Sequence, residues 1–132
     1  MIGAQNPVFS IEIPGRPISK KNTKKVVRRY GVSRVIYSPQ FREWEKQALI
    51  YLKHRAQIFS TIDYHLMAKF VFNFKDHRSE ADVSNLIEAP QDALEKAGVI
   101  KNDRLIQMVH ARKEFGKKES TLIELYRIVV HE

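Results

Sequence analysis

The clearest secondary-structure signal in this sequence is the stretch Ile62-Asp-Tyr-His-Leu-Met-Ala-Lys-Phe-Val-Phe-Asn-Phe74. All of its even-numbered positions are apolar, whereas an acid, a histidine, a lysine and an asparagine interrupt the odd-numbered ones. Successive side chains of an extended chain point to opposite faces, so this alternation is typical of a strand with one buried face. We therefore expect a long strand over residues 62–74.

Other elements are predicted on both sides of this strand. Residues 8–14 alternate in the same way and form a first strand. A helix should begin at Ser38-Pro39, because serine caps helices and proline suits their first position. Two closing strands over residues 105–115 and 121–130, joined by residues 116–119, predict a hairpin.

Length and composition limit the classes of protein to consider. With 132 residues, we expect one small α+β domain over residues 1–132, a mixed or antiparallel sheet with two main helices packed on it. The absence of cysteine excludes disulfides and thiolate metal sites, and it agrees with a reducing cytoplasm. No basic region followed by an apolar run opens the chain, and no stretch approaches the ~20 apolar residues of a membrane span. We therefore expect a soluble, cytoplasmic protein.

The net charge indicates the kind of partner. At +8, with a pI of about 9.8, the chain attracts polyanions, because each neutralised phosphate releases condensed counterions. Nucleic acid is the leading partner. A membrane surface is disfavoured, because no predicted helix combines a basic face with a large apolar one.

The positive charge is concentrated between residues 16 and 34, which include no acid. Its basic residues are Arg16, Lys20, Lys21, Lys24, Lys25, Arg28, Arg29 and Arg34. Two short strands around Tyr30-Gly31 would make a projecting hairpin. One interpretation is a clamp on the DNA backbone, with Tyr30 available to stack on a base. The alternative is a solvated, mobile hairpin without a ligand.

An acidic island follows the long strand, in the run Glu80-Ala-Asp-Val-Ser-Asn-Leu-Ile-Glu-Ala-Pro-Gln-Asp-Ala-Leu-Glu-Lys-Ala-Gly-Val-Ile-Lys-Asn-Asp-Arg104. Ser84 and Asn85 can cap a helix that Gly98 stops. Steps of four place Ser84, Glu88 and Asp92 on one helix face. Pro90 would kink this helix or mark its proper start.

The acidic residues of the island suggest a metal site. If the chain reverses at Gly98, Asp103 would return beside the helix start and join Asp82 and Glu88. Oxygen-only ligands suit Mg²⁺ or Mn²⁺. The alternative is structural, because Asn85 and Glu88 fit a capping box. Lys75 and Arg78, just before the island, are candidates for holding phosphate.

Three runs of the island carry a resemblance to a known family: Asp82-Val-Ser-Asn-Leu, Asp92-Ala-Leu-Glu-Lys-Ala-Gly-Val-Ile and Asn102-Asp103. They resemble RusA-type Holliday junction resolvases, the small crossover junction endodeoxyribonucleases of bacteria and their prophages. The resemblance extends over the first strand, the basic segment and the helix at Ser38-Pro39. It implies a homodimeric, Mg²⁺-dependent nuclease, with Mn²⁺ as a substitute, that nicks four-way DNA junctions in recombination and repair.

The sequence departs from the family pattern at several positions. The usual Asp-x-Asp-Asn has Ser84 in place of its second Asp, although Asp82 and Asn85 match. Asn102 replaces the first residue of a later Asp-Asp pair, whereas Asp103 retains the position that the family uses in catalysis. Glu88 stands where a lysine is common. Glu88 either restores the carboxylate lost at position 84 or leaves a site that binds junctions without efficient cleavage.

The sequence thus predicts hydrolysis of a DNA phosphodiester with Asp82, Asp103 and Glu88 as catalytic and metal-binding residues. No Ser/His/Asp or Cys/His arrangement and no Gly-rich phosphate loop is visible, so covalent catalysis and a nucleotide cofactor are not expected. Two rivals remain, a nucleic-acid-binding module and a nuclease that cuts other branched DNA.

Overall fold

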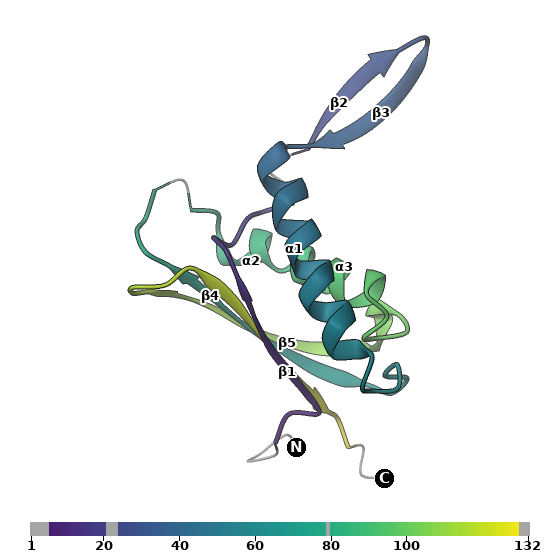
Figure 1. The fold of residues 1–132 in the computed structure, drawn as a ribbon, viewed down its shortest axis with the longest axis vertical. Coiled ribbons are helices and arrows are strands. Elements are labelled where there is room, and N and C mark those ends of the chain that lie inside the picture. Colours follow the sequence, from purple (N-terminus) through teal and green to yellow (C-terminus); the bar gives the residue numbers. More distant parts are fainter. Residues whose placement is uncertain (1–5, 21–23, 79, 130–132) are drawn as a thin grey trace.

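A computed structural model of the chain describes residues 6–20, 24–78 and 80–129. It contains a four-stranded sheet in the order β1-β6-β4-β5 and a separate two-stranded ribbon, β2-β3 (Figure 1). The strands are β1 (Phe9–Pro14), β2 (Lys24–Arg29), β3 (Val32–Tyr37), β4 (Leu66–Phe74), β5 (Ile106–Phe115) and β6 (Ser120–Arg127). The helices are α1 (Pro39–Ala56), α2 (Val83–Leu86), α3 (Glu88–Lys96) and the 3-10 helix η1 (Asp103–Leu105).

Strand β4 lies in the interior of the sheet, and its even-numbered side chains are buried as predicted. It begins at Leu66, four residues later than expected, because Ile62 makes only an isolated bridge with Ile100. The predicted hairpin of the last two strands is wrong. Strand β5 pairs parallel with β4, and β6 pairs antiparallel with β4 on its other side. Helices α2 and α3 connect β4 to β5, and both strands run in the same direction. Residues 116–119 must therefore cross over the end of β4 to reach β6 on its other side.

Helices α1 and α3 pack on the sheet, and the predicted α+β class is confirmed. The Oγ of Ser38 accepts a hydrogen bond from the Phe41 amide at 3.1 Å, so α1 begins where the sequence indicated. One face of α1 is buried, including Phe41, Trp44 and Leu52. Across the described parts of the chain, no helix is long and apolar enough to cross a membrane.

The helix predicted from Ser84 is divided in two. It begins at Val83 with Asp82 at the N-cap position, so the prediction that Ser84 and Asn85 cap it is wrong. A break at Ile87 separates α2 from α3. Pro90 has no N–H to donate to the carbonyl of Leu86, which explains an interruption at this point. Gly98 ends α3 as predicted, with φ of +77° and an N–H that donates to the Glu95 carbonyl at 3.0 Å.

Candidate functional site

Three loops meet at one end of the sheet. Strands β1 and β4 both run antiparallel to β6, and β5 runs parallel to β4. The carboxyl ends of β1, β4 and β5 therefore lie together, followed by residues 15–20, 75–82 and 116–119, which we call the sheet-end loops. Backbone hydrogen bonds join them, since Gly15 donates to Glu119 at 3.1 Å and Gly116 donates to Phe74 at 2.9 Å.

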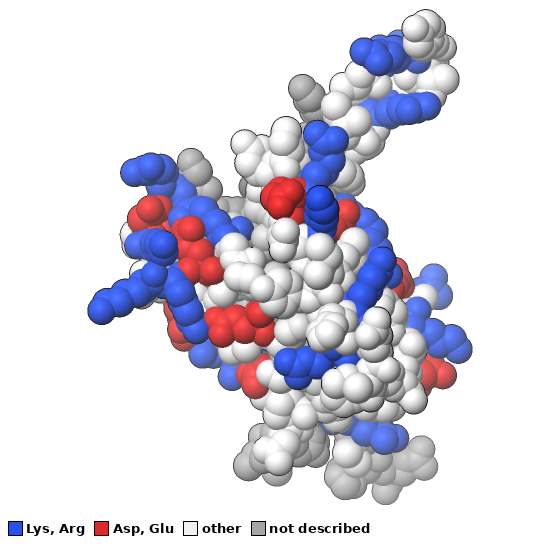
Figure 2. Space-filling model, viewed as in Figure 1, with Lys and Arg blue, Asp and Glu red and all other residues white. Residues whose placement is uncertain are grey.

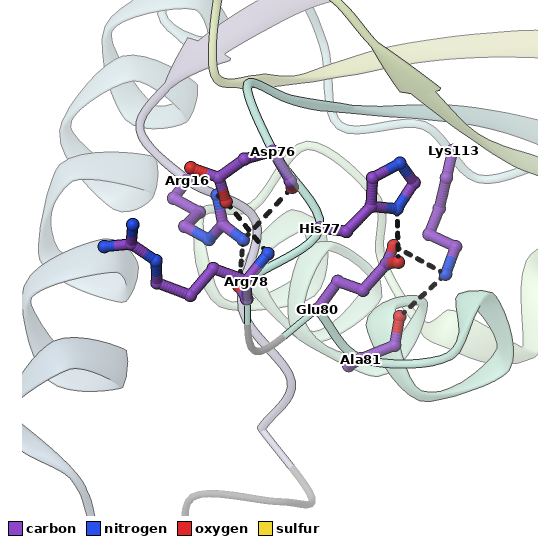
Figure 3. A network of polar contacts seen from close by, with 7 residues as sticks. All are labelled: Arg16, Asp76, His77, Arg78, Glu80, Ala81 and Lys113. Carbon is purple, nitrogen blue, oxygen red and sulfur yellow. Dashed lines mark hydrogen bonds and ion pairs between the residues drawn. The ribbon is translucent and has the colours of Figure 1, made fainter.

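Arg16 connects all three sheet-end loops, and Figure 3 shows its contacts with the loop that follows β4. Its Nη1 lies 2.5 Å from Oε2 of Glu119 and 3.2 Å from Oδ1 of Asp76. Its Nη2 donates to the carbonyl oxygens of Asp76, at 3.4 Å, and Arg78. The guanidinium carbon lies 5.0 Å from the centre of the Phe74 ring. Charge-assisted bonds to four acceptors fix the course of the chain just after β4.

Asp76 closes the turn that follows β4. Its Oδ1 accepts a hydrogen bond from the Arg78 amide at 2.9 Å. This bond, followed by the charges of Arg16 and Arg78, holds the pKa of Asp76 below its usual value of 3.8. The Arg78 guanidinium itself extends away from the network in Figure 3 and, like Lys75, is exposed. Both predicted phosphate contacts thus lie on the surface of this loop.

A second network fixes the segment immediately before Asp82. One carboxylate oxygen of Glu80 lies 2.8 Å from Nδ1 of His77, and the other lies 2.9 Å from Nζ of Lys113 (Figure 3). Lys113 also donates to the carbonyl of Ala81 at 3.2 Å. The bonds from His77 and then Lys113 lower the pKa of Glu80 despite partial burial. The His77 ring stacks on Phe115 with centroids 3.9 Å apart.

Asp82 follows this network and occupies the N-cap position of α2. Its backbone is extended, with φ of −61° and ψ of 148°, but its carboxylate makes no capping hydrogen bond. The side chain is exposed. The carboxylate of Asp82 is therefore presented to solvent from a segment whose backbone is held on both sides.

Glu88 and Asp92 face a different cation, Lys20. The Lys20 ammonium lies 2.5 Å from Oδ2 of Asp92 and 5.2 Å from the centre of the Tyr37 ring. Burial works to lower the pKa of Lys20, but the hydrogen bond and charge of Asp92, followed by the charges of Tyr37 and Glu88, raise it above 10.5. The Lys20 side chain is only 13% exposed and forms an ion pair within the protein. The predicted contact of Lys20 with DNA stays a prediction.

Asp103 lies at the opposite end of the helices from Asp82. Its amide donates to Oε1 of Glu95 at 3.0 Å, next to the last residues of α3. Residues 83–96 span about 20 Å as helix. The expectation that Asp103 returns beside the helix start is thus wrong, because β5 itself, rather than η1, runs back along the helices. Within the described ranges, no three or more His, Cys, Asp or Glu residues lie close enough to hold a metal ion.

Four of the remaining predicted DNA contacts, Lys24, Lys25, Arg28 and Arg29, belong to β2 of the β2–β3 hairpin. Arg28 and Arg29 are exposed there. Lys24 and Lys25 belong to β2, but their side chains, like the whole of Lys21, lie outside the described residues. In Figure 2 the hairpin shows only basic charge, whereas acidic and basic groups are mixed around the sheet-end loops.

Sequence reasoning missed the roles of Glu80 and Lys113 and counted Arg16 only as charge. A lysine on the inward face of β5, between Ala111 and Phe115, was the available signal for Lys113. Arg16 directly follows the end of β1, but its acceptors come from distant segments. Local patterns could not identify those partners.

The fold and these sites define a small basic α+β protein that presents carboxylates among cations, a combination suited to an enzyme acting on nucleic acid. The family model described as Endodeoxyribonuclease RusA matches residues 14–126. A curated relative, Crossover junction endodeoxyribonuclease RusA of Aquifex aeolicus (strain VF5), is 33% identical over 110 residues, which cover 83% of each chain. The chain therefore belongs to the RusA family of endodeoxyribonucleases. The predicted family and enzyme class are confirmed.

Proposed function

We propose that this protein is a Mg²⁺-dependent endonuclease that resolves four-way DNA junctions by paired nicks in recombination and repair. The observation that carries the proposal is the position of Asp82 in a RusA-family chain. Its carboxylate makes no capping hydrogen bond, and it follows a loop that contacts with Arg16 and Lys113 hold in place. Lys75 and Arg78, exposed on the same loop, would bind the phosphates on either side of the cut.

The carboxylates of the chain suit Mg²⁺ in chemistry. Asp82, Glu88 and Asp103 offer only oxygen donors and are all exposed. Asp82 and Asp103 would hold the ion, with Glu88 as a candidate third ligand and Mn²⁺ as a substitute. When bound, the ion would lower the pKa of a water molecule and stabilise charge on the phosphate oxygens. The Glu80 network would keep the Asp82 backbone in position.

A homodimer is part of the proposal. Asp82 and Asp103 lie at opposite ends of the α2–α3 segment, so a site that includes both requires residues from two copies of the chain. A two-fold axis would generate two such sites with the same geometry, which paired nicks on symmetry-related strands require. The composition of the site and the symmetry of the reaction thus both favour a homodimer.

A second candidate function is junction binding without efficient cleavage. Ser84 stands in place of an acid, and Lys20 neutralises part of the negative charge of Glu88 and Asp92. Both features reduce the negative charge that would attract a metal ion. A nuclease that prefers other branched DNA is a nearer rival, because the catalytic groups would be the same.

Cleavage of an end-labelled four-way junction, with Mg²⁺ or with EDTA, tests the proposal. The parent should give paired nicks only with Mg²⁺, and Asp82→Asn should lower the rate at least about a hundredfold. Glu88→Gln tests the candidate third ligand. Asp63→Asn, which removes the same charge from an exposed residue outside these sites, is the matched control. A parent that binds junctions but never cuts them would support the binding function, and preferred cutting of flaps or loops would support the nearer rival.

A further inference from the structure

The tip of the β2–β3 hairpin has an unusual conformation. Tyr30 and Gly31 form its two-residue loop, with φ of +54° and +74°. Positive φ at both positions is the geometry of a type I′ turn, which favours Asn-Gly. A bulky L-residue in this region costs about 1–2 kcal/mol. The Tyr30 side chain is 97% exposed, so packing within the protein does not offset that cost.

One face of the hairpin is hollow and carries a defined set of side chains. The register pairs Val27 with Arg34 and Arg29 with Val32, which places these four on one face. The hollow is lined by Val27, Arg29, Tyr30, Val32, Arg34 and Ile36. It therefore offers an apolar surface bordered by two guanidinium groups, with an aromatic ring at the tip.

The charge of the hairpin indicates which ligand fits this face. No acid occurs between residues 16 and 42. Of the ion pairs found among the described residues, none includes Arg28, Arg29 or Arg34. Figures 1 and 2 show the hairpin projecting from the body with basic side chains along it. A second copy of a chain with charge +8 is electrostatically a poor occupant, whereas a nucleic-acid strand supplies both phosphates and flat apolar bases.

We propose that Tyr30 stacks on an unpaired or unstacked base at the branch point of the DNA, while Arg29 and Arg34 contact the flanking phosphates. In an intact duplex, both faces of an internal base are covered by its neighbours, and uncovering one costs a few kcal/mol. A branch point exposes base faces at lower cost. Tyr30 is therefore a specificity-determining residue that favours branched over linear DNA. This inference rests on the proposed function and extends it to substrate selection.

The test compares Tyr30→Asn with Tyr30→Phe. Asparagine suits the αL position of the turn, so Tyr30→Asn removes the ring while preserving the hairpin. Tyr30→Phe keeps the ring and removes only the hydroxyl. Binding is measured in EDTA, by fluorescence anisotropy, to a four-way junction and to a linear duplex of the same length. Tyr30→Asn should weaken junction binding by about 5- to 100-fold, the value of one stacked base, with little change for the duplex. Tyr30→Phe should bind like the parent.

Arg34→Ala supplies a matched comparison on the same face. It should weaken binding to junction and duplex alike, because a phosphate contact carries no information on branching. Equal junction affinity of Tyr30→Asn and parent would overturn the inference, as would an equal loss on both substrates. A shift of Tyr30→Asn to a smaller oligomer in sedimentation would assign the tip to a second copy instead.

The same samples separate this inference from the proposed function. If the parent prefers junctions and cuts them with Mg²⁺ while Tyr30→Asn retains the junction preference, only the role of Tyr30 fails. If the parent neither prefers nor cuts any branched DNA, the proposed function fails, and the inference fails with it.

Discussion

The sheet-end loops and the β2–β3 hairpin present their charges in opposite ways. At the sheet end, Arg16 contacts four acceptors, and Glu80 is bonded through both carboxylate oxygens. On the hairpin, basic groups stand beside apolar side chains that are largely exposed, with Val26 at 69% and Val32 at 55%. Acids balance bases in the first region, whereas the second has bases alone (Figure 2).

This difference shows how one small protein can separate positioning from recognition. Groups that act on a phosphodiester must be held within about 0.5 Å of their productive positions, which requires a backbone already fixed before substrate arrives. A ribbon that contacts a flexible, highly charged ligand can become more ordered when that ligand binds. The helices packed on the sheet and their adjoining loops therefore bear the candidate catalytic residues, and the projecting ribbon bears candidate DNA contacts.

Removal of one large apolar side chain from each region should give the largest contrast. Phe74 is fully buried beneath Arg16 and stacks on Phe115, so Phe74→Ala should lower the free energy of unfolding by about 3–5 kcal/mol. Val35→Ala, at a hairpin position that is 53% exposed, should change it by less than about 0.5 kcal/mol. Urea unfolding followed by Trp44 fluorescence measures both. Similar losses would show that the hairpin is part of the cooperative core.

Replacing one arginine in each region should give a smaller difference in stability. It also tests directly whether Arg16 positions the loop that leads to Asp82. Arg16→Ala leaves two carboxylates and two carbonyls without their donor, and after allowance for its 30% exposure it should cost about 1–2 kcal/mol. It should also lower kcat for junction cleavage by at least about tenfold through the loop that leads to Asp82, with less effect on KM. Arg16→Lys should restore part of both losses. Arg34→Ala should leave stability unchanged and raise KM instead.

A KM effect without a kcat effect in Arg16→Ala would contradict the positioning role and make Arg16 a DNA contact. Limited proteolysis gives an independent measurement. Cleavage within residues 75–82 should become faster in Arg16→Ala and remain slow in Arg34→Ala, because only the first substitution releases that loop.

The salt dependence of DNA binding tests the role of the β2–β3 hairpin. Each hairpin arginine that neutralises a phosphate should contribute about 1 to the slope of log K against log salt concentration. Arg29→Ala should therefore reduce the slope of junction binding by about 1. Arg112→Ala, on the exposed side of β5 and paired with Glu114, is the control and should leave the slope unchanged. Equal slopes for parent and Arg29→Ala would remove the hairpin from the DNA interface.

Features set by local sequence could be predicted, whereas features set by contacts between distant segments could not. Alternation over residues 62–74, the cap at Ser38 and the stop at Gly98 are local signals, and the elements they indicated are present. The Tyr30-Gly31 turn is equally local. In contrast, the order of the strands depends on the α2–α3 crossover, and adjacency in sequence wrongly suggested that β5 and β6 pair.

The sequence named candidate site residues, whose roles stay a prediction, and the structure arranges them differently from what was expected. Asp82 is exposed at the end of the sheet-end loop over residues 75–82. Asp103 was expected beside it because the chain was assumed to return at Gly98, but the structure places it at the other end of the α2–α3 segment, next to Glu95. Partners such as Arg16 and Glu119 are 103 residues apart, so no short pattern could join them. Long-range ion pairs are set by topology, which the sequence pattern left open.

The smallest expected effect concerns the pH dependence of the Glu80 network. Because the bonds from His77 and Lys113 depress the pKa of Glu80 in the folded state, the stability they contribute is present above its usual value of 4.5. That contribution is lost as the pH falls through the lower, folded-state pKa. The difference in Tm between parent and Glu80→Gln should therefore be present above pH 4.5 and shrink below it, as the parent carboxylate becomes neutral.

Thermal unfolding of both proteins from pH 7 to pH 3 measures this difference. The reason for the convergence is that a protonated glutamate and a glutamine both lack the charge that the Lys113 ammonium requires. A difference in Tm that persists unchanged at pH 3 would show that shape or packing at position 80, rather than charge, supports the loop. In that case the candidate catalytic segment would be held chiefly by the contacts of Arg16.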